Sequence, residues 1–222
     1  MSLSRPQLVL FDLDGTLVDT APDLAWSVDA TLSDLGIETC GEQRVREWIG
    51  SGIESLLHRA LTSDFNGRAS DSLYQQALGI FMDYYFDNVC RLSRIYDGVE
   101  AALNYLESEN IARGCVTNKT TRFTDKLLKE LGLYNEFGII VSGDTLEVKK
   151  PDPAPLLHAA AHFDIPVAES LMVGDSITDV SAARNAGMPV VGVPYGYNQG
   201  RDISKEEPDL VVDNLHALVT LF

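Results

Sequence analysis

Basic residues, cysteines and long apolar runs are all scarce in this sequence of 222 residues. It has 17 lysines and arginines against 33 aspartates and glutamates, which gives a formal net charge of −16. A field of that sign repels the phosphates of nucleic acids and the surface of anionic membranes. We therefore expect neither a nucleic-acid partner nor a membrane partner.

The three cysteines, Cys40, Cys90 and Cys115, are scattered along the chain and form no CxxC pair. This pattern indicates reduced thiols without a disulfide framework or a zinc site. No apolar run approaches the ~20 residues of a membrane span, and the run at residues 8–11 meets Asp12 too early for a signal peptide. We expect a cytoplasmic protein that is a monomer or a homodimer.

Short apolar runs alternate with helix-like stretches over most of the chain. The run at residues 8–11 is continuously apolar, as expected for a strand buried on both faces of a parallel sheet. Similar runs follow at residues 112–116, 138–141, 170–173, 189–193 and, more weakly, 209–212. Helices are predicted between and after them, at residues 98–108, 120–131, 153–163, 178–186 and 214–221. This alternation predicts an α/β fold with a Rossmann-like parallel sheet and helices on both faces.

Residues 18–92 break this alternation. They contain no strand-like run, and their apolar residues predict helices at residues 24–35, 45–49, 53–61 and 73–89. The segment is too long for an ordinary crossover between two strands. We therefore predict a small helical cap domain at residues 18–92, inserted into an α/β catalytic core of residues 1–17 and 93–222. The alternative is that these helices simply pack on the sheet.

Polar residues follow three of the predicted strands where each strand ends. The first strand runs into DLDGT at residues 12–16, the second into TN at residues 117–118, and the fourth into GD at residues 174–175. In open parallel sheets, ligands bind at the carboxyl ends of the strands. We therefore expect these side chains to converge at one edge of the sheet.

Asp12 and Asp14 are the residues of this group that indicate covalent catalysis. A carboxylate can attack phosphorus and form an aspartyl-phosphate, which is the role predicted for Asp12. A second carboxyl can protonate the leaving alkoxide and then take a proton from the attacking water, which is the role predicted for Asp14. Gly15 allows a tight turn close to a ligand, although an ordinary Asp-Gly turn also explains it. Thr16 is a candidate substrate-binding residue.

Asp175 adds a third carboxylate to the predicted site. Three carboxylates in one pocket repel one another, and a hard cation such as Mg²⁺ relieves this repulsion while keeping water and substrate phosphate among its ligands. We predict that Asp12 and Asp175 bind Mg²⁺ through their side chains and Asp14 through its backbone carbonyl. Two interpretations of Asp179 are open. It either supports this site or complements the dipole at the N-terminus of the helix that follows.

Lys150, Thr117 and Asn118 are further candidates for contacts with a phosphoryl group. Lys149 and Lys150 precede Pro151-Asp152-Pro153, and Lys150 is predicted to neutralise the aspartate and the transferring phosphoryl group. A solvated pair of lysines is the alternative interpretation. Thr117 and Asn118 offer a hydroxyl and an amide to phosphate oxygens, although the same residues also make good helix caps.

The motifs DLDGT, TN, KKPDP and GDSITD resemble, in this order, the four motifs of the haloacid dehalogenase superfamily. The resemblance covers essentially the whole chain, including the position of the cap. It implies that Asp12 is the nucleophile and Asp14 the general acid/base. It also implies that Thr117 and Asn118 contact the phosphate, that Lys150 stabilises charge, and that Asp175 binds the metal.

Within that superfamily, four stretches are similar to the bacterial phosphoglycolate phosphatase subfamily: residues 19–24, 48–52, 116–119 and 142–144. One departure is Asp97, which precedes Gly98 where we expect proline. The resemblance also implies that the loop at residues 48–52 closes over the leaving group.

Gly50 and Gly52 in this loop are therefore candidate substrate-binding residues, and a plain turn between helices is the alternative. Closure would exclude water and bring specificity contacts to the phosphate site. His58 and Arg59, in the next predicted helix, are further candidates to face the cleft.

The predicted function is Mg²⁺-dependent hydrolysis of a small phosphorylated metabolite, which the resemblance identifies as 2-phosphoglycolate. Dehalogenation has no phosphoryl group to bind and no alkoxide to protonate, so Asp14 favours phosphate chemistry. A phosphatase for a sugar phosphate such as N-acetylmuramate 6-phosphate, and a phosphomutase, remain open alternatives. The presence of Asp12, Asp14 and Asp175 argues against a non-catalytic module that binds phosphorylated ligands.

Overall fold

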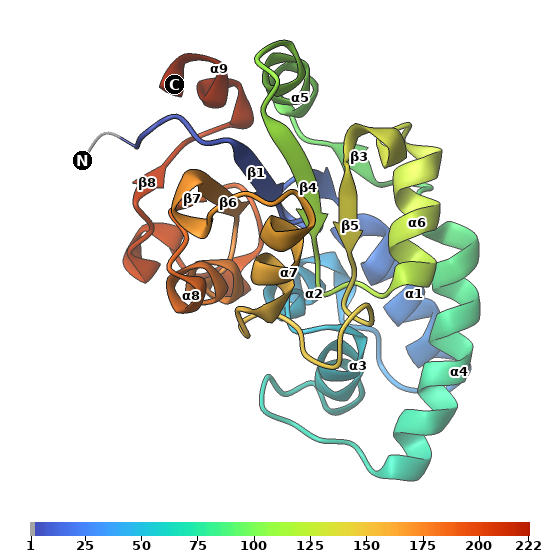
Figure 1. Ribbon diagram of the computed structural model, residues 1–222. Helices are drawn as coiled ribbons and strands as arrows, with labels where there is room; N and C mark the ends of the chain where they lie inside the picture. Colours follow the sequence, from blue (N-terminus) through green and yellow to red (C-terminus); the bar gives the residue numbers. More distant parts are fainter. Residues whose placement is uncertain (1–2) are drawn as a thin grey trace.

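The computed structural model describes residues 3–222, and its centre is a six-stranded parallel sheet (Figure 1). Strand β1 (Leu8–Phe11) lies between β4 and β6 in the order β5-β4-β1-β6-β7-β8. The other strands are β4 (Ala112–Val116), β5 (Ile139–Val141), β6 (Ser170–Gly174), β7 (Val190–Gly192) and β8 (Leu210–Val211). Every neighbouring pair is parallel, which confirms the predicted fold class.

Helices cover both faces of this sheet, which explains why β1 is apolar at every position. Leu8 and Leu10 belong to one buried cluster, and Val9 and Phe11 belong to the other. Such alternation is the period of a strand. The first cluster includes residues of α7 (Ala154–His162) and α8 (Ile177–Ala186). The second includes residues of α5 (Val99–Ser108), α6 (Thr121–Glu130) and α9 (Leu218–Leu221).

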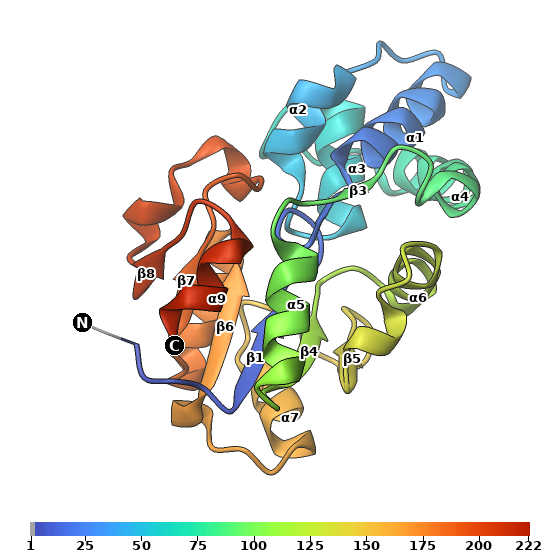
Figure 2. The ribbon, with the colours of Figure 1, turned by 90° about the horizontal axis from the view of Figure 1, so that it is seen from above.

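Four helices lie together at one end of the sheet (Figure 2). They are α1 (Ala21–Asp34), α2 (Gly41–Trp48), α3 (Ile53–Thr62) and α4 (Asp71–Asn88). Leu24, Val28 and Leu32 form the buried face of α1, at the spacing of an amphipathic helix. The side chain of Ser70 caps α4 by accepting a hydrogen bond from the backbone N–H of Leu73.

One prediction for this region was wrong, because residues 18–92 contain a strand. Strand β2 (Val18–Asp19) pairs antiparallel with β3 (Arg94–Ile95). These strands have two residues each, and so short a strand leaves no periodic pattern in the sequence. The segments that lead into and out of α1–α4 therefore lie side by side.

The end of the chain is less helical than predicted. A short 3₁₀ turn at Leu215–Ala217 precedes the single turn of α9, and the side chain of Asn214 caps it. Further 3₁₀ turns lie at Tyr134–Glu136, Val167–Glu169, Asn198–Gly200 and Ile203–Glu206.

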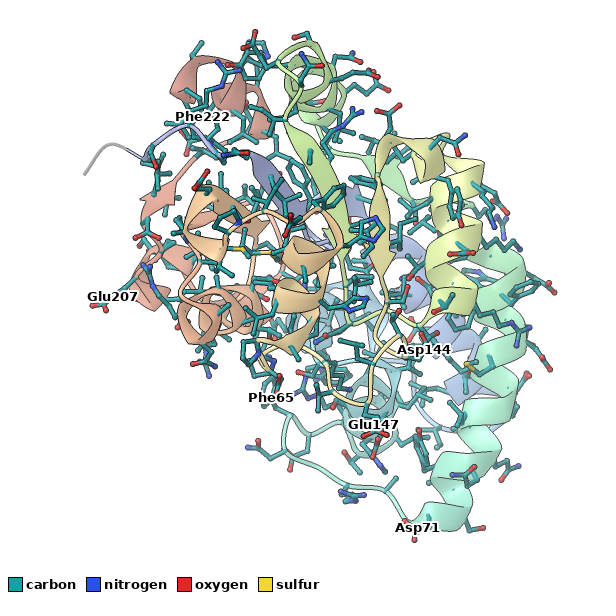
Figure 3. All side chains as sticks on the ribbon, viewed as in Figure 1. Phe65, Asp71, Asp144, Glu147, Glu207 and Phe222 are labelled. Atoms are coloured by element: carbon teal, nitrogen blue, oxygen red, sulfur yellow. The ribbon has the colours of Figure 1, made fainter. Side chains whose placement is uncertain are left out.

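The surface carries much of the acidic charge. Asp71, Asp144, Glu147 and Glu207 are all exposed (Figure 3). The three cysteines are free, as predicted, and Cys115 is buried. Within residues 3–222, none of the helices combines the length and the apolar character needed to cross a membrane.

Candidate active site

The carboxyl ends of three central strands bring the predicted site residues together. Asp12 follows β1, Thr117 follows β4, and Asp175 follows β6. Because β1 pairs with both β4 and β6, these loops are neighbours in space. The sheet order reverses at this point, where ligands bind in folds of this class.

A partly open cavity of about 60 Å³ lies at this edge. A single water needs about 10–15 Å³, so the cavity has room for a small ligand. One wall comes from the loops after the strands and the start of α8, with Asp12, Asp14, Thr117, Asn118, Lys119, Thr120, Lys150, Ser176 and Thr178. The other comes from α1–α4 and their loops, with Leu24, Ile49, Gly50, Gly52, Ile53, Leu56 and Tyr85.

Lys150 is the buried cation at the base of the cavity. Its ammonium lies 2.9 Å from a carboxylate oxygen of Asp12 and 2.7 Å from one of Asp179, and it donates to the carbonyl of Val116 at 2.6 Å. Burial lowers the pKa of Lys150, but the charges of Asp12 and Asp179 outweigh burial, so the net shift is upward. The amine therefore stays charged.

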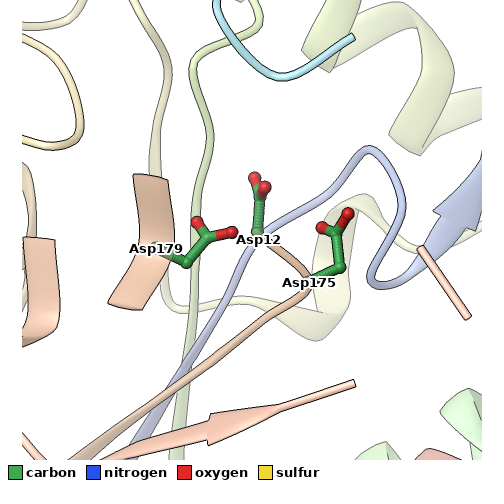
Figure 4. A group of neighbouring side chains, drawn as sticks. All are labelled: Asp12, Asp175 and Asp179. Carbon is green, nitrogen blue, oxygen red and sulfur yellow. The ribbon is translucent and has the colours of Figure 1, made fainter. Parts of the chain in front are cut away.

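Asp12, Asp175 and Asp179 form a cluster in which one carboxylate oxygen from each lies within 4.8 Å of the others (Figure 4). Burial, and then the charge of Asp179, raise the pKa of Asp12 well above its ordinary value. The same two causes raise the pKa of Asp175 to about 7. When all three carboxylates are ionised, the single ammonium of Lys150 leaves a net charge of −2, so the donor set suits a divalent cation bound through oxygen.

A side-chain hydroxyl and a backbone N–H hold the carboxylate of Asp175 in a fixed orientation. One oxygen accepts from the hydroxyl of Thr16 at 2.9 Å, and the other from the backbone N–H of Tyr197 at 2.7 Å. A Cβ added to Gly15, whose φ is +88°, would lie 2.5 Å from the second oxygen, and one at Gly196 would lie 2.2 Å from the Cβ of Asp175. Both glycines therefore leave the space that Asp175 occupies.

Asp14 has different partners from Asp12. Its carboxylate accepts from the hydroxyl of Thr20 at 2.6 Å and from the ammonium of Lys119 at 2.9 and 3.2 Å. The same ammonium donates to the phenol oxygen of Tyr85 on α4 at 2.5 Å. Burial lowers the pKa of Lys119, but Asp14 and Tyr85 shift it upward overall. Lys119 thus connects the loop after β1 with helix α4.

Most predicted substrate-binding residues lie at the cavity, but Thr16 does not. Thr16 is fully buried and its hydroxyl is used by Asp175. Thr117, Asn118, Gly50 and Gly52 line the cavity. The amide of Asn118 donates to the carbonyl oxygens of Lys150 at 2.9 Å and Gly50 at 3.4 Å, and within residues 3–222 its Oδ1 is buried without a hydrogen-bond partner.

His58 and Arg59 do not line the cavity. Nδ1 of His58 accepts from the backbone N–H of Ala69, and its ring stacks on Tyr74. Arg59 donates to the carbonyl oxygens of Trp48 and Phe65. Both side chains therefore hold α3 and its neighbouring loops.

Sequence reasoning gave no role to Lys119, Tyr85 or Tyr197. The hydroxyl of Tyr197 accepts from the backbone N–H groups of Thr20 and Ala21 at 2.8 and 2.9 Å, and it donates to Asp19 at 2.8 Å. The position of Lys119 directly after Thr117 and Asn118 in the sequence could have indicated that it lies at the site. No local pattern marks Tyr85 or Tyr197, because their partners are distant in the sequence.

Known proteins share this architecture over nearly its whole length. A phosphoglycolate phosphatase of Nitrosococcus oceani is 49% identical over 219 residues, which are 99% of this chain and 97% of that protein. One of Thiobacillus denitrificans is 42% identical over 207 residues, which are 93% and 91% of the two chains. The crystal structure of a predicted phosphoglycolate phosphatase from Haemophilus somnus has a TM-score of 0.91 at 32% identity and covers 99% of both chains.

The family itself is also matched directly. The sequence model of the haloacid dehalogenase-like hydrolases matches residues 9–193, from β1 to just beyond β7. That range contains Asp12, Lys150 and Asp175, and it confirms the resemblance found in the motifs. The chain belongs to the family of haloacid dehalogenase-like hydrolases.

Proposed function

We propose that this chain is a phosphatase that hydrolyses 2-phosphoglycolate to glycolate and phosphate through an aspartyl-phosphate on Asp12. The observation that carries the proposal is that Asp12, Asp14 and Lys150 line one cavity, with the ammonium of Lys150 2.9 Å from Asp12. Relatives that span nearly the whole chain are phosphoglycolate phosphatases, which supports the choice of substrate.

In the first step, a carboxylate oxygen of Asp12 bonds to phosphorus while the bond between phosphorus and the ester oxygen breaks. Asp14 donates a proton to the departing oxygen, so glycolate leaves as the alcohol. The ammonium of Lys150 stabilises the negative charge on the transferring phosphoryl group from a buried position, where its electrostatic effect is larger than in water.

In the second step, water hydrolyses the aspartyl-phosphate. The carboxylate of Asp14 takes a proton from the water as the water oxygen bonds to phosphorus. The bond between phosphorus and the Asp12 oxygen breaks, which restores the carboxylate of Asp12 and releases phosphate. We propose that the hydroxyl of Thr117, a residue of the cavity wall, donates to a phosphate oxygen.

Mg²⁺ is the cofactor that we propose, held by the side chains of Asp12 and Asp175 and by the carbonyl oxygen of Asp14. When bound, it supplies positive charge to the phosphoryl oxygens. The net negative charge of the cluster and the fixed orientation of Asp175 support this assignment. Asp179 shares the cluster, and its hydrogen bonds to Lys150 and Ser176 suit a supporting role.

We also propose that residues 18–92 act as a cap over a core of residues 1–17 and 93–222. Supporting this division, α1–α4 gather at one end of the sheet and supply one wall of the cavity (Figure 2). A cap that closes over the substrate excludes water from the reacting groups. Gly50 and Gly52, with φ of +112° and +89°, lie in the loop of that wall.

The test is phosphate release from 2-phosphoglycolate by the purified chain, with Mg²⁺ and after complete metal removal by EDTA. A panel of sugar phosphates and nucleotides is measured alongside. We expect the highest kcat/KM for 2-phosphoglycolate and loss of activity in EDTA. Undiminished turnover without metal would reject Mg²⁺, and a higher kcat/KM for a sugar phosphate would reject the substrate.

A further inference from the structure

The cavity wall contains two cations among the residues that the structure describes, Lys119 and Lys150. The three N–H groups of Lys150 have three partners, since they meet Asp12, Asp179 and the carbonyl of Val116. An ammonium has no further donor. Lys150 therefore serves the phosphoryl end of the cavity, and a second anionic group on the substrate needs another cation.

Lys119 has the capacity that Lys150 lacks. Its side chain is 3% exposed, and its charge is balanced by one carboxylate, that of Asp14. Its other partner is the phenol of Tyr85, and burial raises the pKa of Tyr85 above its ordinary value, so that partner is neutral. A buried ammonium beside one carboxylate and one neutral hydroxyl can accept a second anion more easily than one beside two carboxylates.

The wall from α1–α4 is otherwise apolar. Leu24, Ile49, Ile53 and Leu56 contribute hydrocarbon surface, and Tyr85 contributes the single side-chain hydroxyl of that wall. A sugar would bury several hydroxyls against this surface without hydrogen-bond partners, which is unfavourable for each of them. A short leaving group whose polar end meets Lys119 and Tyr85 avoids this cost.

The distance between Lys119 and the reacting groups suits a very short leaving group. The ammonium lies 2.9 Å from Asp14, which is the proposed proton donor to the ester oxygen. In 2-phosphoglycolate, one methylene separates that oxygen from the carboxyl carbon. When Asp14 contacts the ester oxygen, the carboxylate of the leaving group therefore lies within reach of Lys119.

Resting on the proposed phosphatase function, we propose that Lys119, together with the hydroxyl of Tyr85, binds the carboxylate of the leaving group. Lys119 is then the residue that selects phosphate esters of short hydroxy acids over esters of neutral alcohols. A charge-assisted hydrogen bond of this kind, formed in a buried site, discriminates against a ligand that lacks the anion.

The experiment compares 2-phosphoglycolate with its neutral amide, 2-phosphoglycolamide, which has the same length and the same ester bond. The ratio of their kcat/KM values is measured for the wild type, Lys119→Met and Tyr85→Phe. We expect Lys119→Met to lower this ratio on the order of 30-fold, the size of one charge-assisted hydrogen bond, and Tyr85→Phe to lower it about 5-fold. Lys129→Met, an exposed lysine on α6, should leave the ratio unchanged.

Equal losses on both substrates in a folded Lys119→Met chain would overturn the proposal, because Lys119 would then act on Asp14 alone. Circular dichroism and thermal melting show whether each variant folds. If Lys119→Met does not fold, the test rests on Tyr85→Phe. A ratio of kcat/KM for 2-phosphoglycolate to kcat/KM for its amide that equals the wild-type ratio would then overturn the proposal.

Failure of the proposed phosphatase function can be distinguished from failure of the proposed role of Lys119. A wild-type chain that releases phosphate from neither ester, nor from any ester of the panel, would reject the phosphatase function. Calorimetric binding of the two esters to an Asp12→Asn chain, with and without Lys119→Met, still tests Lys119, because this readout needs no turnover. Equal affinity for ester and amide in the Asp12→Asn chain would overturn the role of Lys119.

Discussion

The carboxylate of Asp179 lies 2.7 Å from the ammonium of Lys150, and both side chains are almost fully buried. The other oxygen of Asp179 accepts from the backbone N–H and the hydroxyl of Ser176, which forms a capping box at the start of α8. One carboxylate therefore fixes both the lysine at the base of the cavity and the loop that carries Asp175. Its removal should affect stability and catalysis together.

We predict that Asp179→Asn lowers the free energy of unfolding by about 3 kcal/mol, because breaking a buried ion pair leaves its partner uncompensated. We expect kcat to fall about 100-fold, since Lys150 loses one of the two carboxylates that position it. Urea unfolding and steady-state kinetics measure both effects. The exposed Asp202→Asn is the control, and equal behaviour of the two variants would contradict the prediction.

Asp12→Asn should remove activity while the fold is retained. The amide is a poor nucleophile toward phosphorus, and we expect kcat to fall by at least about 1,000-fold. Phosphate release measures the loss, and circular dichroism measures the fold. Asp71→Asn, at an exposed position in the first turn of α4, is the matched control. A near-wild-type rate for Asp12→Asn would rule out the proposed nucleophile.

Asp14→Asn should slow both chemical steps, because it removes the group that donates and then accepts a proton. Loss of general acid–base catalysis costs about 100- to 10,000-fold in rate. Rapid-quench experiments with ³²P-labelled substrate would follow the aspartyl-phosphate, which we expect to form slowly or to persist. Rapid formation and complete hydrolysis of the intermediate would exclude this role for Asp14.

The stability of the metal-free chain should fall as the pH rises toward and through about 7. Burial and the charge of Asp179 raise the pKa of Asp175 to about 7, so between its ordinary value and about 7 the folded chain binds more protons than the unfolded chain. Stability then decreases with rising pH across that window. Mg²⁺ favours the ionised carboxylates and should offset this loss.

Thermal melting at pH 5 and pH 8, with and without Mg²⁺, measures this coupling. The increase in Tm caused by Mg²⁺ should be larger at pH 8, where protons no longer compete for Asp175. Asp175→Asn should abolish most of the difference. An equal increase at both pH values in the wild-type chain would contradict the prediction.

Tyr197→Phe should destabilise the connection between the core and α1. The phenol oxygen accepts from the backbone N–H groups of Thr20 and Ala21, and both groups would lose their acceptor. We expect a loss of about 1–3 kcal/mol in the free energy of unfolding. Tyr134→Phe, in the 3₁₀ turn at Tyr134–Glu136, should be nearly neutral. Comparable losses in both variants would disprove a special role for Tyr197.

The sequence predicted the sheet and the convergence of Asp12, Thr117 and Asp175 because both follow from topology. A strand covered on both faces has to be apolar throughout, as β1 is. Parallel strands also bring the residues that follow them to one edge. Asp12 and Lys150 are distant in the sequence, and the segments that follow β1 and β5 bring them into contact.

The partners of individual side chains were not predictable in the same way. Thr16 lies in the predicted motif DLDGT, but its side chain is fully buried and its hydroxyl donates to Asp175. Tyr85 meets Lys119 only through the packing of α4 against the loop after β4. Such contacts depend on how elements that are distant in the sequence pack together, so the spacing of neighbouring residues does not predict them.

The pairing of β2 with β3 has a consequence for how this molecule can be altered. Val18 pairs with Ile95 and Asp19 pairs with Arg94, so the chain leaves the sheet and returns to it through one antiparallel pair of short strands. The segment between these strands is nevertheless packed on the rest of the molecule, because α1–α4 and the face of the sheet that carries Val9 and Phe11 share one buried apolar cluster. Replacement of α1–α4 by another helical segment is therefore expected to need matching changes on α6, where Phe123 packs on Tyr85 with ring centroids 4.8 Å apart.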